Sequence, residues 1–196
     1  MKLAIFASGS GSNAEAIVRY LHDNQPEKGI RVACVITNKA DAYVLDRAKR
    51  LGIPALYLTS DQLKSQETLL PILREYGVSH IVLAGYLALI PKFLLEAFPQ
   101  RIVNIHPALL PKYGGKGMYG MHVHEAVKAA GESETGITIH VIDEEYDRGT
   151  TLFQAHTKVS PEDTPEEIAQ KVHVLEHRYF PEVIASWVLG DPQPEL

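Results

Sequence analysis

Residues 2–14 of the chain read KLAIFASGSGSNA. The apolar run Lys2–Ala7 is typical of a buried strand, and Ser12 is placed to cap the amphipathic helix that follows. Between them, the glycine-rich turn 8–13 directs backbone N–H groups and a helix N-terminus toward one point. Such a turn binds an anion without a cationic side chain, and we therefore predict a phosphate site there. The apolar positions of the helix are Ala14, Ile17, Val18 and Leu21.

Two alternatives to this prediction remain. The letters from Gly9 to Ala14 also fit the dinucleotide-binding fingerprint, which calls for an acid about 20 residues further on to bind the ribose of NAD. The next apolar run, Arg31–Thr37, ends at Asn38 instead. A nucleotide-like monophosphate is therefore preferred to NAD, and an ordinary glycine turn is the other alternative.

Apolar runs alternate with helical patterns over the first hundred residues. This order predicts an α/β fold with a single-domain, doubly wound, mostly parallel sheet, whose ligands gather at the C-terminal ends of its strands. Sites are then expected near residues 8–13, 85–90 and 104–107. The expected strands are Lys2–Ala7, Arg31–Thr37, Ala55–Leu58, His80–Ala84 and Ile102–Ile105, and the expected helices are 13–23, 42–51, 61–76, 91–97 and, later, 122–130.

The second half of the chain is expected to extend the sheet. Gly136–Ile142 and Leu152–Val159 alternate like strands and are expected to pair antiparallel at the edge. The segment Pro107–Met121 carries four glycines and little periodicity, so it predicts a loop for which a mobile lid is one option. The domain is expected to span residues 1–189, with 190–196 as a tail.

The last helix has a clear start. Thr164, Pro165 and Glu167 form a capping-box pattern with proline at the first helical position. Pro181 is expected to interrupt or kink this helix, because proline lacks the N–H that the helix interior needs. The expected buried stripe is Ile168, Val172, Leu175 and Tyr179.

Composition excludes several classes of protein. The 196 residues, 45% of them hydrophobic, suit one well-packed domain. A formal charge of −5 without a stripe of lysine or arginine argues against a nucleic-acid surface. No apolar stretch has the length of a signal or membrane segment, so a cytoplasmic location away from the membrane is expected. Cys34, the single cysteine, lies in an apolar strand pattern and is expected to be a buried, inert thiol.

Asn104 and His106 are the first candidates for chemistry. They follow a buried strand, and strand alternation places both side chains on the same side. An amide donor and an imidazole stabilise a developing oxyanion and handle protons when a carboxylate holds the imidazole. Asp147, in the turn after the strand that carries His140, is the candidate carboxylate. The alternative for His106 is a hydrogen-bonded structural histidine.

A second histidine group resembles a metal motif. The stretch from His173 to His177 has the spacing of an inverted zinc-protease motif, with Glu176 between the two histidines. No third ligand is evident, so no metal is expected. His122 and His124 are expected to point different ways on a helix, as loop or surface histidines.

Four segments of the chain match a known family: Ser8–Asn13, Leu83–Leu87, Asn104–Tyr113, and Thr135–His140 leading to Asp147. In these segments, and from end to end, the chain resembles the phosphoribosylglycinamide formyltransferases. This resemblance implies transfer of a formyl group from 10-formyltetrahydrofolate to glycinamide ribonucleotide, in the cytoplasm, by a monomer or homodimer that needs no metal. The nearest rivals are a formyltransferase acting on methionyl-tRNA, which normally adds an RNA-binding domain, and a non-catalytic module that binds a nucleotide at 8–13.

The resemblance also implies residue roles. The catalytic set is Asn104, His106 and Asp147. The ribonucleotide is held by Gly11, Ser12 and Asn13 at its phosphate, and by His173 and Glu176. The folate pocket is lined by Leu87, Ala88, Leu89 and Ile90, together with Asn104 and His140.

Two departures from the family pattern affect the folate side. Gln66 and Ala88 stand where relatives carry arginines suited to the glutamate carboxylate of the folate. The segment Gly114–Met121 is also longer than in the shorter bacterial members.

Overall fold

The computed structural model describes residues 1–144 and 149–196. In this part of the chain, seven strands are hydrogen-bonded in the order β3-β2-β1-β4-β5-β6-β7, which confirms the doubly wound sheet with an antiparallel extension. Contacts between residues group the chain into two compact units, 1–103 and 104–196. The strands are β1 Lys2–Phe6, β2 Arg31–Thr37, β3 Ala55–Tyr57, β4 His80–Leu83, β5 Ile102–His106, β6 Glu134–Val141 and β7 Thr151–Lys158.

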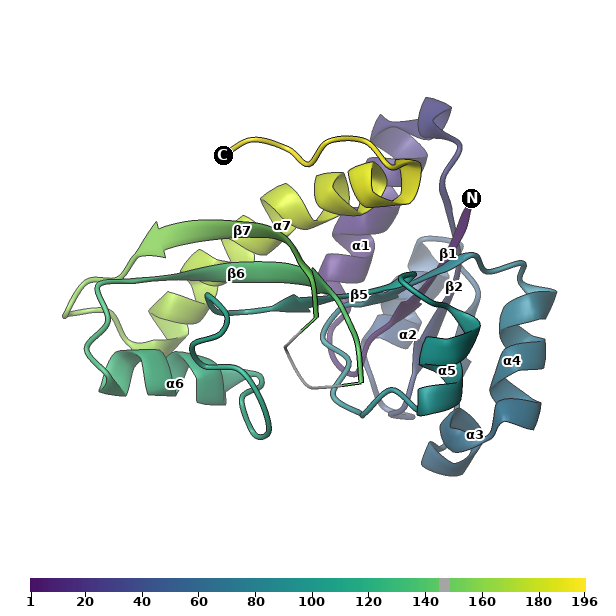
Figure 1. Cartoon of the computed structure of the whole chain (residues 1–196), viewed down its shortest axis with the longest axis horizontal. Coiled ribbons are helices and arrows are strands. Elements are labelled where there is room, and N and C mark those ends of the chain that lie inside the picture. Colours follow the sequence, from purple (N-terminus) through teal and green to yellow (C-terminus); the bar gives the residue numbers. More distant parts are fainter. Residues whose placement is uncertain (145–148) are drawn as a thin grey trace. The chain divides into compact units, whose positions relative to one another are not determined.

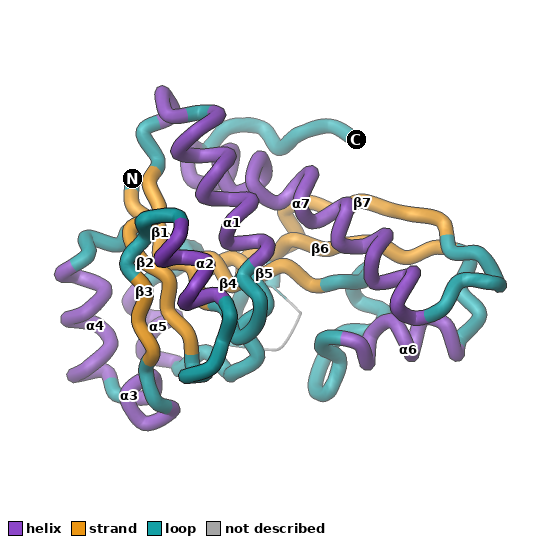
Figure 2. Tube along the Cα trace, turned by 180° about the vertical axis from the view of Figure 1, so that it is seen from behind, coloured by secondary structure: helices purple, strands orange, loops and turns teal. Residues whose placement is uncertain are grey.

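The first unit is built around β1. Residues Leu3–Ala7 are almost entirely buried, because β1 pairs in parallel with both β2 and β4, and helices cover both faces of the sheet. Figure 2 shows helices on one face of strands β1, β2 and β3 and further helices on the opposite face. The helices of the first face are α1 Ser12–Arg19 and α2 Val44–Arg50, and those of the second are α3 Ser60–Lys64, α4 Gln66–Glu75 and α5 Lys92–Ala97.

Two helix predictions in this unit are wrong in detail. The expected helix 61–76 is two helices, because Ser65 has extended backbone between α3 and α4. The expected helix 13–23 ends as α1 at Arg19 and continues as a π-helical turn, Tyr20–Asn24, before a 3₁₀ turn, Pro26–Lys28. The spacing of apolar residues in a short segment does not distinguish an α-helix from a π-helical or a 3₁₀ turn, because all three keep their apolar side chains on one side.

The second unit packs two helices with the antiparallel strands β6 and β7, which pair through Ile137 and Ala155. The helix α7, Pro165–Leu189, lies along both strands and also contacts α6, Met121–Ala129 (Figure 1). The capping box at Thr164 is confirmed, since its side chain accepts from the Glu167 N–H.

The buried stripe of α7 differs from the prediction. Leu175 and Tyr179 are only partly buried, whereas Glu176 and Phe180 take the core positions. Pro181 does not interrupt the helix, which runs continuously through it. Pro181 and its neighbours on this stripe are buried, and their packing offsets the missing backbone hydrogen bond.

Gly136 in β6 leaves no room for a side chain. A Cβ at this position would lie 1.9 Å from the Ala155 carbonyl oxygen and 2.8 Å from Leu109 Cδ2. We expect Gly136→Ala to destabilise the fold by about 3 kcal/mol, because the backbone of β7 must move. Thermal unfolding should then show Tm lowered by roughly 6–12 °C. Gly9→Ala is the control, since a Cβ there meets nothing within 4 Å; equal melting of both variants would contradict the expectation.

Cys34 is buried in β2, as predicted. Burial raises the pKa of its thiol to about 12, so the reactive thiolate is scarce at neutral pH. Among the helices that the structure describes, none combines the length and apolar character needed to cross a bilayer.

Candidate functional site

The glycine-rich turn of the first unit is fixed to the ends of two strands. The Ser8 hydroxyl donates to Asn38 Oδ1 at 2.6 Å, just beyond β2, and accepts from the Leu87 N–H at 3.0 Å, beyond β4. The Ser8 N–H also donates to the Gly85 carbonyl at 3.0 Å. Ser8 is 4% exposed, so these bonds lie away from solvent. Asn38, at the position where NAD-binding proteins place an acid, therefore serves to hold the turn.

Position 11 requires a glycine because of its backbone conformation and its close neighbour. Its φ of 75° lies in the left-handed region, and a Cβ would come within 2.3 Å of Val44 Cγ2. Gly11, and not Ser12 as predicted, is the N-cap of α1. The sequence did not reveal this because the decisive neighbour, Val44, lies 33 residues away. The first N–H groups of α1 find no acceptor within the helix, as at every helix start, so Ser12 and Asn13 begin the helix where an anion is favoured.

The segment after β4 presents apolar side chains. Leu87 and Leu89 are 50% and 63% exposed, whereas Ile90 is buried and Ala88 is partly buried. Covering such exposed leucine side chains with a ligand is favourable, because it removes apolar surface from water. The predicted folate-binding segment therefore has surface for an aromatic ring to cover.

Asn104 and His140 are joined in the second unit. Asn104 Nδ2 donates to His140 Nε2 at 3.2 Å, so His140 carries its proton on Nδ1. His140 is 1% exposed. This bond uses one of the two N–H donors of the Asn104 amide and fixes the direction of the other.

His106 is held by a backbone carbonyl. Its Nε2 lies 2.6 Å from the Tyr113 carbonyl oxygen, which only accepts, so Nε2 carries a hydrogen and donates it to this oxygen. Tyr113 has φ 56°, which is uncommon for a residue with a side chain. Its hydroxyl donates to Glu132 at 2.8 Å, and it packs against the apolar cluster of Val127, Val159 and Ile168. His106 is thus hydrogen-bonded, as the structural alternative also expects.

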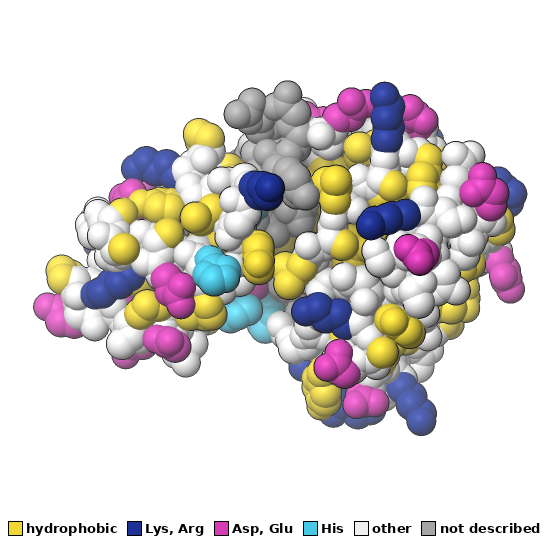
Figure 3. All heavy atoms as spheres, turned by 90° about the horizontal axis from the view of Figure 1, so that it is seen from below, with side chains coloured by type: hydrophobic (Ala, Val, Ile, Leu, Met, Phe, Trp, Pro, Cys, Tyr) yellow, Lys and Arg dark blue, Asp and Glu magenta, His cyan; other side chains and the backbone are white. Residues whose placement is uncertain are grey.

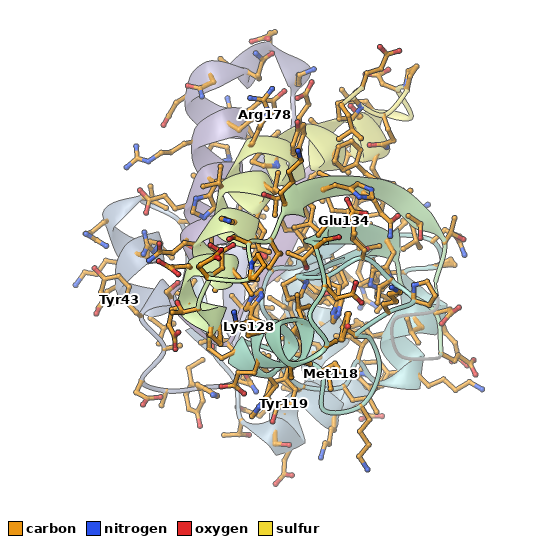
Figure 4. The ribbon with its side chains drawn as sticks, turned by 90° about the vertical axis from the view of Figure 1, so that its left-hand side faces the viewer. Tyr43, Met118, Tyr119, Lys128, Glu134 and Arg178 are labelled. Carbon is orange, nitrogen blue, oxygen red and sulfur yellow. The ribbon has the colours of Figure 1, made fainter. Side chains whose placement is uncertain are left out.

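Thr138 is a positioning residue that the sequence prediction missed. Its hydroxyl donates to the Ala108 carbonyl at 2.7 Å and accepts from the Leu110 N–H at 3.0 Å and from Gln154 Nε2 at 2.9 Å. These bonds fix the chain directly after His106. The available signal was a polar residue between Ile137 and Ile139 in a strand that is otherwise predicted to be buried. The part of the 107–121 loop up to Tyr113 is therefore anchored, and Met118 and Tyr119 lie on the part that follows (Figure 4).

Glu176 is a buried carboxylate on α7. It is 6% exposed, and its Oε2 lies 2.9 Å from His173 Nδ1. This hydrogen bond raises the pKa of His173 above its ordinary value, against the smaller opposing effect of burial. The structure therefore brings together Glu176 and His173, the two residues of α7 that are expected to hold the ribonucleotide.

The zinc-motif alternative gains nothing from this geometry. His173 pairs with Glu176, and its ring centroid lies 6.1 Å from that of His177. Within residues 1–144 and 149–196, no group of three or more His, Cys, Asp or Glu side chains is arranged to hold a metal ion.

The prediction for His124 is wrong. His124 is 5% exposed, because α6 packs against α7, and no hydrogen-bond partner for its Nδ1 is present in the described part of the chain. Burial lowers the pKa of His124, although the charge of Glu176 nearby acts in the opposite direction. His122, by contrast, is exposed, as predicted. Figure 3 shows histidine side chains together on one face of the molecule.

Asp147, the third member of the predicted catalytic set, lies outside the described residues.

The pairing of His173 with Glu176 makes a prediction for titration. We expect Glu176→Gln to lower the pKa of His173, because the variant loses the carboxylate that favours the protonated imidazole. The stability that this pair adds to the native protein is present below the unfolded-state pKa of histidine and is lost as the pH rises through the raised pKa. NMR titration of the imidazole signals measures the shift. Glu182→Gln removes an equal charge further along α7 as the control, and an unchanged His173 titration in Glu176→Gln would refute the pairing.

Comparison with known proteins places the chain among formyl transferases. Residues 1–184 match the family described as formyl transferase. The chain is 45% identical over 193 residues to the chloroplastic phosphoribosylglycinamide formyltransferase of Arabidopsis thaliana, covering 94% of this chain and 64% of that protein. It is 38% identical over 194 residues to the phosphoribosylglycinamide formyltransferase of Haemophilus influenzae, covering 96% and 88%. The chain thus spans less than two thirds of the length of the plant relative.

Solved structures agree. Glycinamide ribonucleotide transformylase 1 from Symbiobacterium toebii superposes with a TM-score of 0.87 at 34% identity, covering 97% of this chain and 88% of that one. Phosphoribosylglycinamide formyltransferase from Bacillus halodurans gives 0.85 at 38% identity, covering 96% and 95%.

Proposed function

Since the chain belongs to the formyl transferase family, we propose that it transfers the formyl group of 10-formyltetrahydrofolate to the amine of glycinamide ribonucleotide, a step of purine synthesis. The observation that carries this proposal is the pair Asn104 and His106 at the end of β5. One is oriented by His140 and the other by the Tyr113 carbonyl. Two relatives that bear this activity in their names align over more than nine tenths of the chain.

The proposed reaction is a direct attack. The uncharged amine of the ribonucleotide forms a bond to the formyl carbon, and the carbonyl oxygen becomes the oxyanion of a tetrahedral intermediate. The Asn104 amide and protonated His106 stabilise that charge by hydrogen bonds. The bond to the folate nitrogen then breaks, and the proton of the amine passes to that nitrogen. Asp147, assigned by family resemblance, orients the imidazole and assists the proton transfer, and no metal is needed.

The ribonucleotide is bound through its phosphate and its ribose in this proposal. Backbone N–H groups of Gly11, Ser12 and Asn13 bind the phosphate, as glycine-rich turns at helix starts do. Glu176, with His173 beside it, accepts hydrogen bonds from the ribose hydroxyls. A buried carboxylate makes stronger hydrogen bonds than an exposed one, which suits this role.

The folate is assigned to Leu87, Ala88, Leu89 and Ile90 with Asn104 and His140. Gln66 and Ala88 offer no guanidinium to the glutamate carboxylate, so we propose that this end of the folate is held weakly. We further propose a cytoplasmic monomer or homodimer that binds neither nucleic acid nor membrane; the formal charge of −5 supports the exclusion of nucleic acid.

The test of this function is to mix the purified protein with glycinamide ribonucleotide and 10-formyltetrahydrofolate. Absorbance follows the deformylated folate, and mass spectrometry identifies the formylated ribonucleotide. Both products are expected at equal amounts. Binding of the ribonucleotide without either product would favour the non-catalytic module. Transfer to methionyl-tRNA but not to the ribonucleotide would favour the other formyltransferase.

A further inference from the structure

Three successive carbonyl groups of the glycine-rich turn are each held by a donor. The Gly9 carbonyl accepts from the Val44 N–H at 3.1 Å, and the Gly11 carbonyl accepts from the Glu15 N–H at 2.9 Å. Between them, the Ser10 carbonyl accepts from Arg47 Nε at 2.8 Å. Two of these donors are backbone groups, and the third is a side chain.

Holding the carbonyls also directs the N–H groups. In a planar trans peptide, the C=O of one residue and the N–H of the next point in opposite directions. The carbonyls of Gly9 and Ser10 point to donors on α2, so the N–H groups of Ser10 and Gly11 point away from α2. The Gly11 carbonyl points along α1, so the N–H of Ser12 points back from the start of that helix. Successive N–H groups arranged in this way form an anion-binding concavity.

Arg47 also joins the turn to the first helix. Its Nη1 forms an ion pair with Glu15 Oε2, and Glu15 lies in the first turn of α1. The other oxygen of Glu15 accepts from Arg19 at 2.8 and 2.9 Å. The hydrogen bonds from Arg47 and then Arg19 lower the pKa of Glu15, so its carboxylate stays charged. The side chains of Arg47 and Glu15 are only 20% and 24% exposed.

An arginine suits this position because its planar guanidinium presents several donors in fixed directions. One edge meets the Ser10 carbonyl while another nitrogen meets Glu15. A lysine has one charged nitrogen on a flexible chain, so it reaches either partner with less directional control. The positive charge of Arg47 is paired with Glu15. The contribution of Arg47 to the turn is therefore to fix the direction of the peptide group that contains the Ser10 carbonyl.

We propose that Arg47, braced by Glu15, is a positioning residue that sets the direction of the Gly11 N–H and thereby the affinity of the turn for the phosphate of the substrate. This inference rests on the proposed function for the identity of that substrate, but the phosphate contact itself is tested separately below.

Arg50 provides a matched control. It lies on the same helix, carries the same charge and, like Arg47, lies over the Tyr43 ring. Its hydrogen bond, however, goes to the Tyr43 hydroxyl, with an Nη2 to oxygen distance of 2.8 Å, and not to the turn. Tyr43 is 47% exposed and lies at the surface of the first unit (Figure 4). Loss of Arg50 therefore removes an equal positive charge from α2 without releasing the Ser10 carbonyl.

The kinetic experiment compares Arg47→Met, Arg47→Lys, Glu15→Gln and Arg50→Met. We expect Arg47→Met to raise KM for glycinamide ribonucleotide by about 10-fold or more, the effect of losing one charge-assisted hydrogen bond. Its kcat and its KM for the folate should stay close to those of the native protein. Arg47→Lys and Glu15→Gln should give smaller increases, and Arg50→Met should give almost none. An equal increase in Arg50→Met would show a general effect of charge and would overturn the proposal.

A binding experiment is independent of formyl transfer. Ribose 5-phosphate is titrated into ¹⁵N-labelled protein, and the amide signals of Gly11, Ser12 and Asn13 are followed, with ribose as the control ligand. We expect these signals to shift with ribose 5-phosphate only, and the affinity to fall in Arg47→Met. If the protein transfers no formyl group but gives this result, the proposed function fails and the role of Arg47 stands. If Arg47→Met folds and binds ribose 5-phosphate with native affinity, the positioning role of Arg47 is overturned. If Arg47→Met does not fold, native affinity in both Arg47→Lys and Glu15→Gln overturns that role.

Discussion

Replacing His106 by alanine is expected to lower kcat by on the order of 100-fold or more, with little change in the affinity for the ribonucleotide. The same is expected of Asn104→Ala. In the proposed mechanism both groups act on a charge that exists only after attack on the formyl carbon, and loss of one such donor costs roughly 3 kcal/mol. An interaction made only in the transition state appears in kcat and not in substrate binding. Steady-state kinetics and calorimetric titration of the ribonucleotide measure the two effects.

His122→Ala is the matched control for this pair, since His122 is a histidine that is 63% exposed at the start of α6. Its turnover should resemble that of the native protein. Asn104→Ala also removes the donor to His140 Nε2, so Asn104→Asp adds a second comparison that keeps the shape but not the N–H groups. If either His106→Ala or Asn104→Ala turns over at nearly the native rate, the altered residue has no part in the mechanism.

Asp147→Asn is expected to be about as damaging, again by on the order of 100-fold in kcat. Asparagine keeps the shape of the side chain but removes the negative charge that, in the proposed mechanism, favours the imidazolium form of the catalytic histidine. Single-turnover kinetics measures the chemical step directly, with the enzyme and the ribonucleotide both in excess over 10-formyltetrahydrofolate. Asp143→Asn removes an equal charge from the same connection between β6 and β7 and serves as the control. A similar loss in both variants would indicate a general effect of charge in this connection and would remove Asp147 from its assigned role.

The fold was predictable from sequence because its signals are local. The strand Arg31–Thr37 has the predicted bounds, and β1 differs from the prediction by one residue, since buried parallel strands give continuous apolar runs. The break at Ser65 was missed because one polar residue between two helical patterns does not by itself identify a helix end. The N-cap position of Gly11 was assigned to Ser12 instead, because the contact with Val44 that requires a glycine there forms only in the folded chain.

The candidate site likewise has some features that the sequence predicts and others that depend on the folded chain. The shared side of Asn104 and His106 follows from the period of a strand, and no further information is needed. The burial of Glu176 and His124 depends on how α6 and α7 face each other, because a charged residue within an apolar helix pattern predicts a solvent-exposed position. A backbone partner such as the Tyr113 carbonyl leaves no signal in the residue type at all.

The Tyr113 carbonyl, as a backbone partner of His106, affects which mutations the site tolerates. A carbonyl oxygen is present whatever amino acid occupies position 113, so no single substitution deletes the acceptor that holds His106. The position of this carbonyl depends instead on the contacts that keep the backbone in place there, such as the hydroxyl bond to Glu132 and the Thr138 bonds to residues 108 and 110. Insertions after position 113 fall beyond these fixed points. An insertion between Gly114 and Gly120 is therefore expected to add surface there while the histidine keeps its orientation.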